Sequence, residues 1–303
     1  MIGRVIKGIG GFYFVHDGNV AVMGKARGNL KRNKELIYVG DIVDFDIDEN
    51  DCDGECVINR VIERRNFLTR PPVSNLDTLV VVFSLKEPAV NYPVIDKLLA
   101  GCELKGIRPV VCITKRDLVS DTELEAALEI YRDIYPVVSV NGNTGEGLDD
   151  LRELIRGRNA ALAGPSGVGK STITNLLHGD QDGFDVTRGD TAAPAETGRI
   201  SDRTGRGRHT TRHVEIFALG DDTYLYDTPG FTSLDMPEMD ESEVRDLFPE
   251  MRVLAGNCRY RDCMHINEPD CAVKEAVDDG KIHVSRYNSY LMMTGEVKKW
   301  KKL

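Results

Sequence analysis

Residues 164–172 decide the fold, and they read Gly164, Pro165, Ser166, Gly167, Val168, Gly169, Lys170, Ser171 and Thr172. The first eight fit the pattern GxxxxGK[ST], in which the backbone N–H groups of a glycine-rich loop surround phosphate groups. An apolar run precedes the loop at 159–163 and a helical pattern follows at 170–177, as such a loop requires. We predict a nucleotide-phosphate site in which Lys170 reaches the β- and γ-phosphates and Ser171 binds Mg²⁺.

A base-reading motif follows the apolar run at 109–114, and it consists of Thr114, Lys115, Arg116 and Asp117. The Asp117 carboxylate can accept both N–H donors of guanine, and adenine cannot supply that pair. The stem of Lys115 would lie along the purine. Thr114 stands where Asn is usual, so we expect a weaker base site. After the next apolar run comes a stretch that resembles the loop supporting guanine through backbone N–H groups: Ser139, Val140 and Asn141.

The order of these motifs is unusual. In ordinary GTPases the phosphate loop comes first, whereas here the base-reading motif at 114–117 precedes the phosphate loop at 164–171. This order predicts a circularly permuted GTPase domain. Apolar runs alternate with helical patterns over residues 78–226, which favours a mainly parallel sheet with helices on both faces.

A second metal motif ends the apolar run at 223–226, where Asp227 begins the sequence DTPG. We expect Asp227 to hold Mg²⁺ through a water and the N–H of Gly230 to contact the γ-phosphate. The polar stretch 180–212 lies between the two phosphate motifs and contains six arginines. Its position favours a switch segment in which Thr210 or Thr211 closes over Mg²⁺; the alternative is a disordered insertion.

The residue after Gly230 bears on the rate of hydrolysis. Many GTPases have a water-orienting Gln there, but this chain has Phe231, which cannot polarise water. We therefore expect slow intrinsic hydrolysis. His209 is the candidate for positioning the water, and its alternative interpretation is an exposed loop histidine.

A metal-binding pattern of the form C-x4-C-x-H-x5-C lies near the C-terminus, and its members are Cys258, Cys263, His265 and Cys271. Three thiolates and one imidazole complete a tetrahedral Zn²⁺ shell with no open position, which indicates a structural site. A small module with few apolar residues would need that metal to fold. The alternative is a set of reduced, buried cysteines beside a chance histidine.

Three domains are predicted: a β-barrel of the OB type at 1–70, the permuted GTPase domain at 71–235 and a helical zinc-binding domain at 236–303. Short strands broken by glycines favour the barrel, and the Pro71-Pro72 pair marks its end. Basic residues cluster at 25–34 and 60–70, which suits either an RNA-binding face or a solvated surface. The formal net charge of −10 argues against a generally basic nucleic-acid binder.

The setting follows from what the chain lacks. No apolar run is long enough to span a membrane, and Met1 leads directly into strand-like sequence. We expect a cytoplasmic protein with no membrane partner. The odd count of seven cysteines fits thiols or metal ligands better than a disulfide framework. No dimerisation segment is recognised, and we expect a monomer.

Together these motifs resemble the circularly permuted, small-ribosomal-subunit-dependent GTPases called RsgA or YjeQ. The resemblance covers nearly the whole chain, including GRHTT at 207–211, DTPGF at 227–231 and the terminal cysteines. It implies GTP hydrolysis stimulated by the small ribosomal subunit, a role in late maturation of that particle, and contact with its rRNA. It also implies that His209 is the catalytic histidine. Val140, like Thr114, departs from the usual residue.

Two other functions compete with a GTPase that acts as an assembly factor. An RNA-binding scaffold could hold nucleotide with little catalysis, although the intact set of Lys170, Ser171 and Asp227 argues against it. The chain could also be a P-loop kinase for small molecules, but the guanine-reading Asp117 argues against that function. Nucleotide preference and stimulation of turnover by the particle would separate the three.

Overall fold

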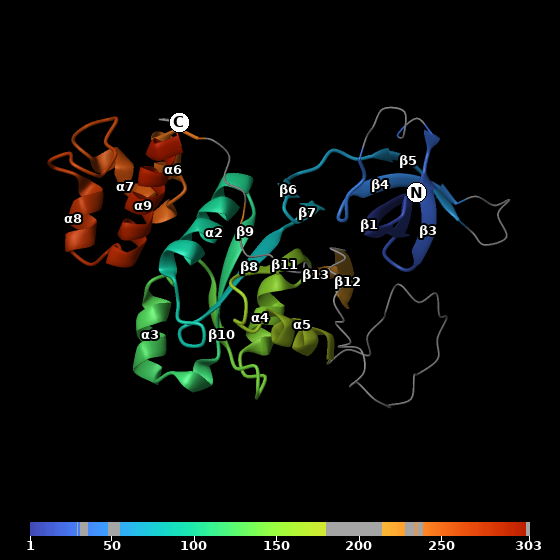
Figure 1. The fold of residues 1–303 in the computed structure, drawn as a ribbon, viewed down its shortest axis with the longest axis horizontal. Helices are drawn as coiled ribbons and strands as arrows, with labels where there is room; N and C mark the ends of the chain where they lie inside the picture. The colour runs from blue at the N-terminus through green and yellow to red at the C-terminus, as the bar shows by residue number, and fades with distance from the viewer. Residues whose placement is uncertain are drawn as a thin grey trace.

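The structure is a computed structural model that describes residues 1–28, 30, 36–47, 55–179, 214–227, 234 and 239–300. A barrel and a helical module lie at opposite ends of the molecule, with a sheet covered by helices between them (Figure 1). The barrel comes from the N-terminal part of the chain and the helical module from the C-terminal part, so the chain runs from one end of the molecule to the other.

The N-terminal barrel is closed and has the strand order β1-β2-β3-β5-β4. Its strands are β1 (Ile2–Ile9), β2 (Phe12–His16), β3 (Ala21–Ala26), β4 (Ile42–Ile47) and β5 (Cys56–Val61). β3 pairs with β5 in parallel, whereas the other pairs are antiparallel. This is the five-stranded barrel predicted from the sequence, with the strand order of an OB fold. Val5, Val15 and Phe45 fill its interior.

A short hairpin connects the barrel to the sheet, formed by β6 (Phe67–Thr69) and β7 (Pro72–Ser74). Val39 of the barrel forms a parallel bridge with Val73, and the hydroxyl of Tyr226 in the sheet donates to the carbonyl of Ser74. The predicted boundary at 70/71 falls in the turn of this hairpin. The connector is therefore tied to both neighbours, because each of them bonds to β7.

The central sheet has the order β10-β9-β8-β11-β13-β12. Its strands are β8 (Thr78–Ser84), β9 (Arg108–Thr114), β10 (Val137–Val140), β11 (Asn159–Ala163), β12 (Glu215–Gly220) and β13 (Thr223–Asp227). All are parallel except the edge strand β12. The chain enters at β8, runs outward to β10, returns beside β8 as β11 and continues to the other edge. The direction of winding thus reverses between β8 and β11, and ligands of such sheets bind at the carboxyl ends of the strands at this point.

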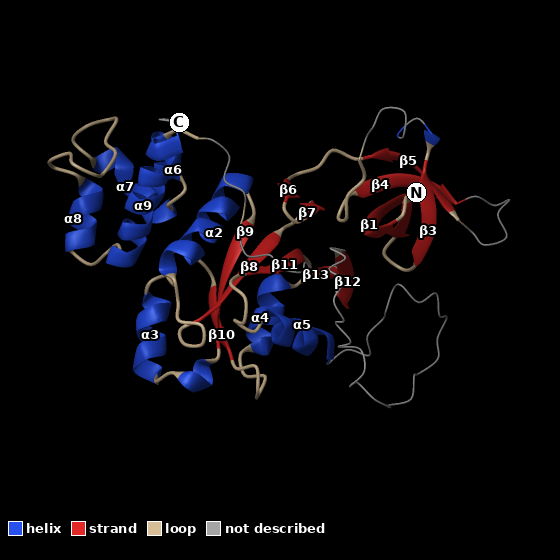
Figure 2. Ribbon diagram, in the orientation of Figure 1, coloured by secondary structure: helices blue, strands red, loops and turns tan. Residues whose placement is uncertain are grey.

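Helices cover both faces of the sheet (Figure 2). These are α2 (Tyr92–Lys105), α3 (Asp121–Glu129), α4 (Leu148–Ile155) and α5 (Lys170–Gly179). All seven side chains of β8 are buried. Alternate residues point to opposite faces, so that Val81 packs in the core shared with α2 and Val82 in the core shared with α4 and α5. A continuous apolar strand is the pattern expected of a parallel sheet that is covered on both sides.

The C-terminal module consists of α6 (Glu241–Asp246), α7 (Pro249–Leu254), α8 (Ala272–Asp278) and α9 (Val284–Trp300). It has its own core, which includes Phe248 and Tyr290. Arg286 of α9 is buried and forms ion pairs with Asp96 of α2 at 2.7 Å and Glu250 of α7 at 2.8 Å. This junction fixes the module to the sheet domain. Among the described segments, no helix combines the length and apolar character needed to cross a membrane.

Candidate nucleotide site and candidate metal centre

The loop from Gly164 to Gly169 joins β11 to α5, at the point where the winding of the sheet reverses. Gly164 has φ 148°, and a Cβ atom there would lie 1.9 Å from the carbonyl oxygen of Val82. Only glycine fits this close approach of two backbones. Val168, next to the last residue of the loop, is buried in the core and anchors that end of the loop.

Lys170 begins α5, and its ammonium group bonds to the first residues of the loop. Its Nζ donates to the carbonyl oxygens of Gly164 and Pro165, both at 2.7 Å. Burial lowers the pKa of Lys170. Ser171 and Thr172 are exposed in the first turn of α5. The loop therefore presents a lysine and a helix N-terminus at one place, and both favour an anion.

Thr114 ends β9 and is buried beside the phosphate loop. Its Oγ1 lies 2.6 Å from the carbonyl oxygen of Val168 and 3.1 Å from that of Phe83. The hydroxyl thus connects the base-reading motif to the phosphate loop directly, despite the shorter reach of Thr compared with Asn.

The other residues of the base-reading motif follow in a short 3₁₀ turn (Arg116–Leu118). Lys115 has φ 54° and donates from Nζ to the carbonyl of Glu87. Arg116 pairs with Glu146 at 2.7 Å, and the exposed carboxylate of Asp117 accepts from Asn143 Nδ2 at 3.3 Å. Glu146 and Asn143 both belong to the loop that follows β10.

The structure places Ser139 and Val140 within β10, where they pair with Ile113 and Thr114 of β9. The loop that follows, residues 141–147, supplies the side chains that contact Arg116 and Asp117. Neither Asn143 nor Glu146 is predicted from the sequence as a site residue. The sequence NGNTGEG indicates a loop at this position, but it does not show which side chains turn toward Asp117.

Asp227 is the last residue of β13, and its side chain is exposed. β13 lies next to β11 and parallel to it, so Asp227 comes at the carboxyl ends of the strands, as the phosphate loop does. The other residues predicted to act at the γ-phosphate, Mg²⁺ or the attacking water fall outside the described part of the chain: His209, Thr210, Thr211, Gly230 and Phe231.

The four predicted metal ligands meet in the C-terminal module, and their ligand atoms all lie within 4.8 Å of one another. His265 Nδ1 is 3.3 Å from Cys271 Sγ and 3.5 Å from Cys258 Sγ, and the two sulfurs are 3.9 Å apart. Zinc bonds of the usual length in a tetrahedron give ligand separations of about 3.5–3.8 Å. The donor set and its spacing therefore fit a zinc ion.

The loop that carries His265 is held in place by α9. The Tyr287 hydroxyl donates to the carbonyl of His265 at 2.6 Å, and the Tyr290 hydroxyl donates to the carbonyl of Met264. Burial lowers the pKa of His265, which favours the neutral imidazole that a metal requires. Burial also raises the pKa of the Cys263 thiol to about 12, so metal binding there would release a proton.

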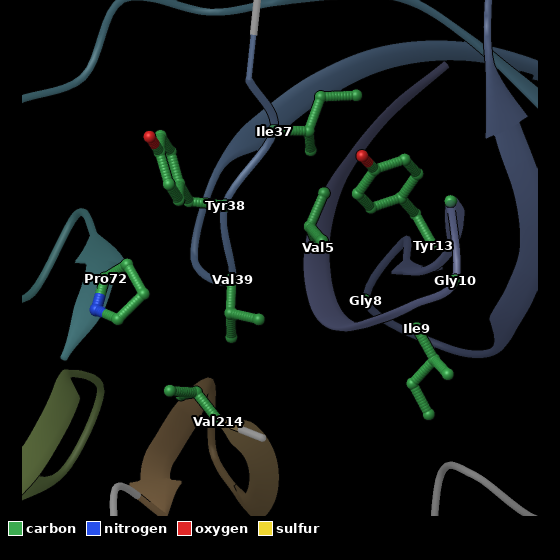
Figure 3. Close-up of a pocket in the computed structure, with 11 residues that line it drawn as sticks. Val5, Gly8, Ile9, Gly10, Tyr13, Ile37, Tyr38, Val39, Pro72 and Val214 are labelled. Atoms are coloured by element: carbon green, nitrogen blue, oxygen red, sulfur yellow. The ribbon is translucent and has the colours of Figure 1, made fainter. Parts of the chain in front are cut away.

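Two of the cavities that the described residues line are relevant to these elements. One of about 370 Å³ lies beside the phosphate loop, between Ser166 and the first turn of α2 at Val94. The other, of about 270 Å³, lies where the barrel meets the sheet, and Tyr13, Tyr38 and Val214 line it (Figure 3). The second cavity contains none of the predicted nucleotide or metal ligands.

Fold and site together define a class of protein. A phosphate loop at the switch point of a parallel sheet, preceded in the chain by the base-reading motif, is a circularly permuted P-loop GTPase fold. Here that fold carries an N-terminal OB barrel and a C-terminal helical module with a Cys₃His cluster that could hold zinc.

Comparisons with known proteins agree with this class. The family model described as RsgA GTPase matches residues 61–237, and that described as RsgA N-terminal domain matches residues 2–54. A protein of Caldanaerobacter subterraneus subsp. tengcongensis, called small ribosomal subunit biogenesis GTPase RsgA, is 39% identical over 301 residues, covering 99% of this chain and 97% of that protein. A protein of the same name from Alkaliphilus metalliredigens is 39% identical over 98% of both chains.

Solved structures show the same likeness. YjeQ from Thermotoga maritima is 31% identical over 98% of both chains, with a TM-score of 0.78. YloQ, described as a circularly permuted GTPase, is 31% identical over 98% of this chain and 95% of its own, with a TM-score of 0.79. The chain belongs to the RsgA GTPase family.

Proposed function

We propose that this protein hydrolyses GTP to GDP and phosphate and acts in the biogenesis of the small ribosomal subunit. The observation that carries the nucleotide part is the junction at Thr114, which joins a guanine-reading motif to a complete phosphate loop through the carbonyl of Val168. The ribosomal part rests on membership of a family whose curated relatives carry that role in their name.

Each site residue has a role in this proposal. Lys170 leaves the loop carbonyls to contact the β- and γ-phosphates, and Asp117 accepts the two N–H groups of guanine. Ser171 and Asp227 would hold Mg²⁺, which neutralises developing charge on the phosphates when it is bound. The first turn of α5 adds backbone N–H groups beside the β-phosphate.

Hydrolysis also requires an oriented water. Phe231 has no polar atom for this task, so we assign it to His209, with Thr210 or Thr211 completing the magnesium shell. In this proposal the ribosomal particle positions residues 209–211, so turnover without the particle is slow.

The same proposal assigns a role to each of the three predicted domains. We assign the barrel at 1–70 to rRNA contact, residues 71–235 to the GTPase domain and residues 236–303 to a module with one structural zinc. A monomer working in the cytoplasm suits a factor that binds and leaves a ribosomal particle. GTP binding favours docking in this scheme, and hydrolysis favours release.

The test is GTP hydrolysis by the purified protein with and without small ribosomal subunits, with ATP as the control nucleotide. We expect a slow rate with GTP, strong stimulation by the particle and no comparable rate with ATP. Lys170→Ala should abolish turnover because it removes the phosphate-binding cation. Unchanged turnover with the particle would contradict the ribosomal role, and equal use of ATP would contradict the assignment of Asp117.

A scaffold that only holds nucleotide would bind GTP and the particle without stimulated turnover. A small-molecule kinase would transfer phosphate to an acceptor other than water. Measuring the release of inorganic phosphate in the same assay separates both from a GTPase.

A further inference from the structure

The loop after β10 has a conformation that its own residues fix. Asn141 is 8% exposed, and its Oδ1 accepts the backbone N–H groups of Asn143 at 2.9 Å and Thr144 at 3.4 Å. Its backbone N–H donates to the carbonyl of Glu146, and its carbonyl accepts from Gly145, both at 2.9 Å. Asn141 is thus the centre of a compact turn, which gives the side chains around it defined directions.

This loop contacts both parts of the nucleotide site. A Cβ atom on Gly142 would lie 3.0 Å from Cγ2 of Thr172, so the loop packs closely on the first turn of the phosphate-binding helix. On its other side it contacts the base-reading motif at two places. Glu146 pairs with Arg116 at 2.7 Å, and Asn143 Nδ2 donates to Asp117 Oδ2 at 3.3 Å.

The second of these contacts concerns the group that reads the base. Guanine donates two parallel N–H bonds, one to each carboxylate oxygen, so the plane of the Asp117 carboxylate must face the base. Asp117 is exposed, and an exposed carboxylate rotates freely unless another group holds it. Each carboxylate oxygen has two lone pairs, so Oδ2 can accept from Asn143 and from guanine together.

We propose that Asn143 is a positioning residue for guanine recognition, holding the Asp117 carboxylate in the orientation that accepts both N–H groups of the base. Glu146 supports it by fixing the loop to Arg116. The inference rests on the proposed GTP site. It adds a specificity-determining residue that lies in the loop beyond β10, outside the base-reading motif itself.

The nucleotide itself supplies a way to test orientation. Inosine diphosphate retains the N1–H of GDP but lacks the 2-amino group, so it makes one bond to the carboxylate where GDP makes two. A free carboxylate can turn to accept a single bond, whereas two parallel bonds require a fixed plane. Loss of Asn143 should therefore weaken GDP more than inosine diphosphate, and a general disturbance of the loop would weaken both equally.

The experiment is titration of wild type and Asn143→Ala with GDP, inosine diphosphate and ADP. We expect Asn143→Ala to weaken GDP about five- to tenfold, as for the net loss of one typical hydrogen bond at an exposed site, and inosine diphosphate by no more than about twofold. Glu146→Gln should weaken GDP by about threefold or less, because its ion pair is exposed. Asn19→Ala, at a turn of the barrel, is the matched control and should change neither affinity.

The outcomes separate this inference from the proposed function. If wild type binds GDP and Asn143→Ala binds it equally well, or loses GDP and inosine diphosphate to the same extent, Asn143 has no positioning role. If wild type prefers ADP or binds no nucleotide, the proposed GTP site itself is wrong. Circular dichroism of each variant identifies a variant that fails to fold, and in that case Asn143→Asp, which places a like charge beside Asp117, replaces it with the same expected order of losses.

Discussion

Thr114 is the residue on which the two halves of the nucleotide site depend. Its hydroxyl, buried between β8, β9 and the phosphate loop, lies 2.6 Å from the carbonyl of Val168. Thr114→Val keeps the shape of the side chain and removes the donor, which leaves a buried carbonyl without this partner. We expect a cost of about 1–2 kcal/mol, or roughly 5- to 30-fold in GDP affinity if the phosphate loop carries the loss.

Isothermal titration with GDP measures this effect, and Thr122→Val on the exposed face of α3 is the control. Full GDP affinity in Thr114→Val would mean that the phosphate loop holds its shape without the link. In that case the two loops act independently, and the proposal that one assembled site binds GTP loses its main structural support.

At the scale of elements, a buried ion pair joins α9 to α2. The Arg286 side chain is 1% exposed and that of Asp96 is fully buried. Glu250 also pairs with the guanidinium, and the rings of Phe248, Tyr131 and Tyr135 lie around it. Arg286→Met keeps much of the volume but leaves two carboxylates unpaired. We expect a loss of about 3–5 kcal/mol in the free energy of unfolding, measured with urea.

A second change tests the cause of that loss. Adding Asp96→Asn to Arg286→Met removes the most deeply buried of the unpaired charges, so the double variant should recover part of the stability. A double variant as unstable as the sum of its two single changes would contradict the ionic explanation and indicate lost packing.

The junction of β2 with β13 should respond to pH. His16 Nδ1 lies 3.1 Å from the hydroxyl of Tyr224. Burial lowers the pKa of its imidazole below the usual 6.5; the neighbouring Asp17 opposes this shift and Arg4 adds to it. The unfolded chain therefore binds the proton more readily than the folded one. Stability from this group is complete above pH 6.5 and is lost as the pH falls through the lowered pKa.

We therefore expect the melting temperature of wild type to fall more steeply between pH 7 and pH 5 than that of His16→Gln. His283→Gln, at the exposed start of α9, is the comparison variant and should keep the slope of wild type. Equal slopes for wild type and His16→Gln would show that His16 takes up its proton without opening the junction.

The elements also show what sequence can predict. The bounds of β11 agree with the apolar run predicted at 159–163 because that run ends directly at the glycine-rich phosphate loop. The hairpin of β6 and β7 is missed because three-residue strands around a Pro-Pro pair carry no periodicity. Arg286 and Asp96 are 190 residues apart, and no local pattern predicts that they meet. For the same reason the motifs locate Asp117 but do not identify Asn143.

At the scale of the whole molecule, the permuted order of motifs determines which part of the chain follows the nucleotide site. The strand that ends at Asp227 leads along the chain into the C-terminal module, which is also fixed to α2 through Arg286. The first turn of α2 borders the cavity beside the phosphate loop. The C-terminal module is therefore connected to the nucleotide site in two ways: through the chain that follows Asp227, and through the buried ion pair between Arg286 and α2.

This double connection allows a prediction about the metal. The sequence alone predicts that the module needs zinc to fold, but the structure gives it a core that contains Phe248, Met251 and Tyr290. Removing the metal should therefore loosen the loop at 258–271 and α8, whereas α9 should stay on α2 through Arg286. We expect amide exchange in α8 to accelerate by about tenfold or more, equivalent to ~1.4 kcal/mol.

Hydrogen exchange before and after treatment with a zinc chelator measures this, and metal analysis should count one zinc lost per chain. Cys258→Ala should give the same exchange pattern without chelator. GDP affinity should change by less than about twofold, because a local opening of α8 does not reach the phosphate loop. If α9 loses its protection together with α8, the metal supports the whole module, and the ion pair at Arg286 is too weak to hold α9 alone.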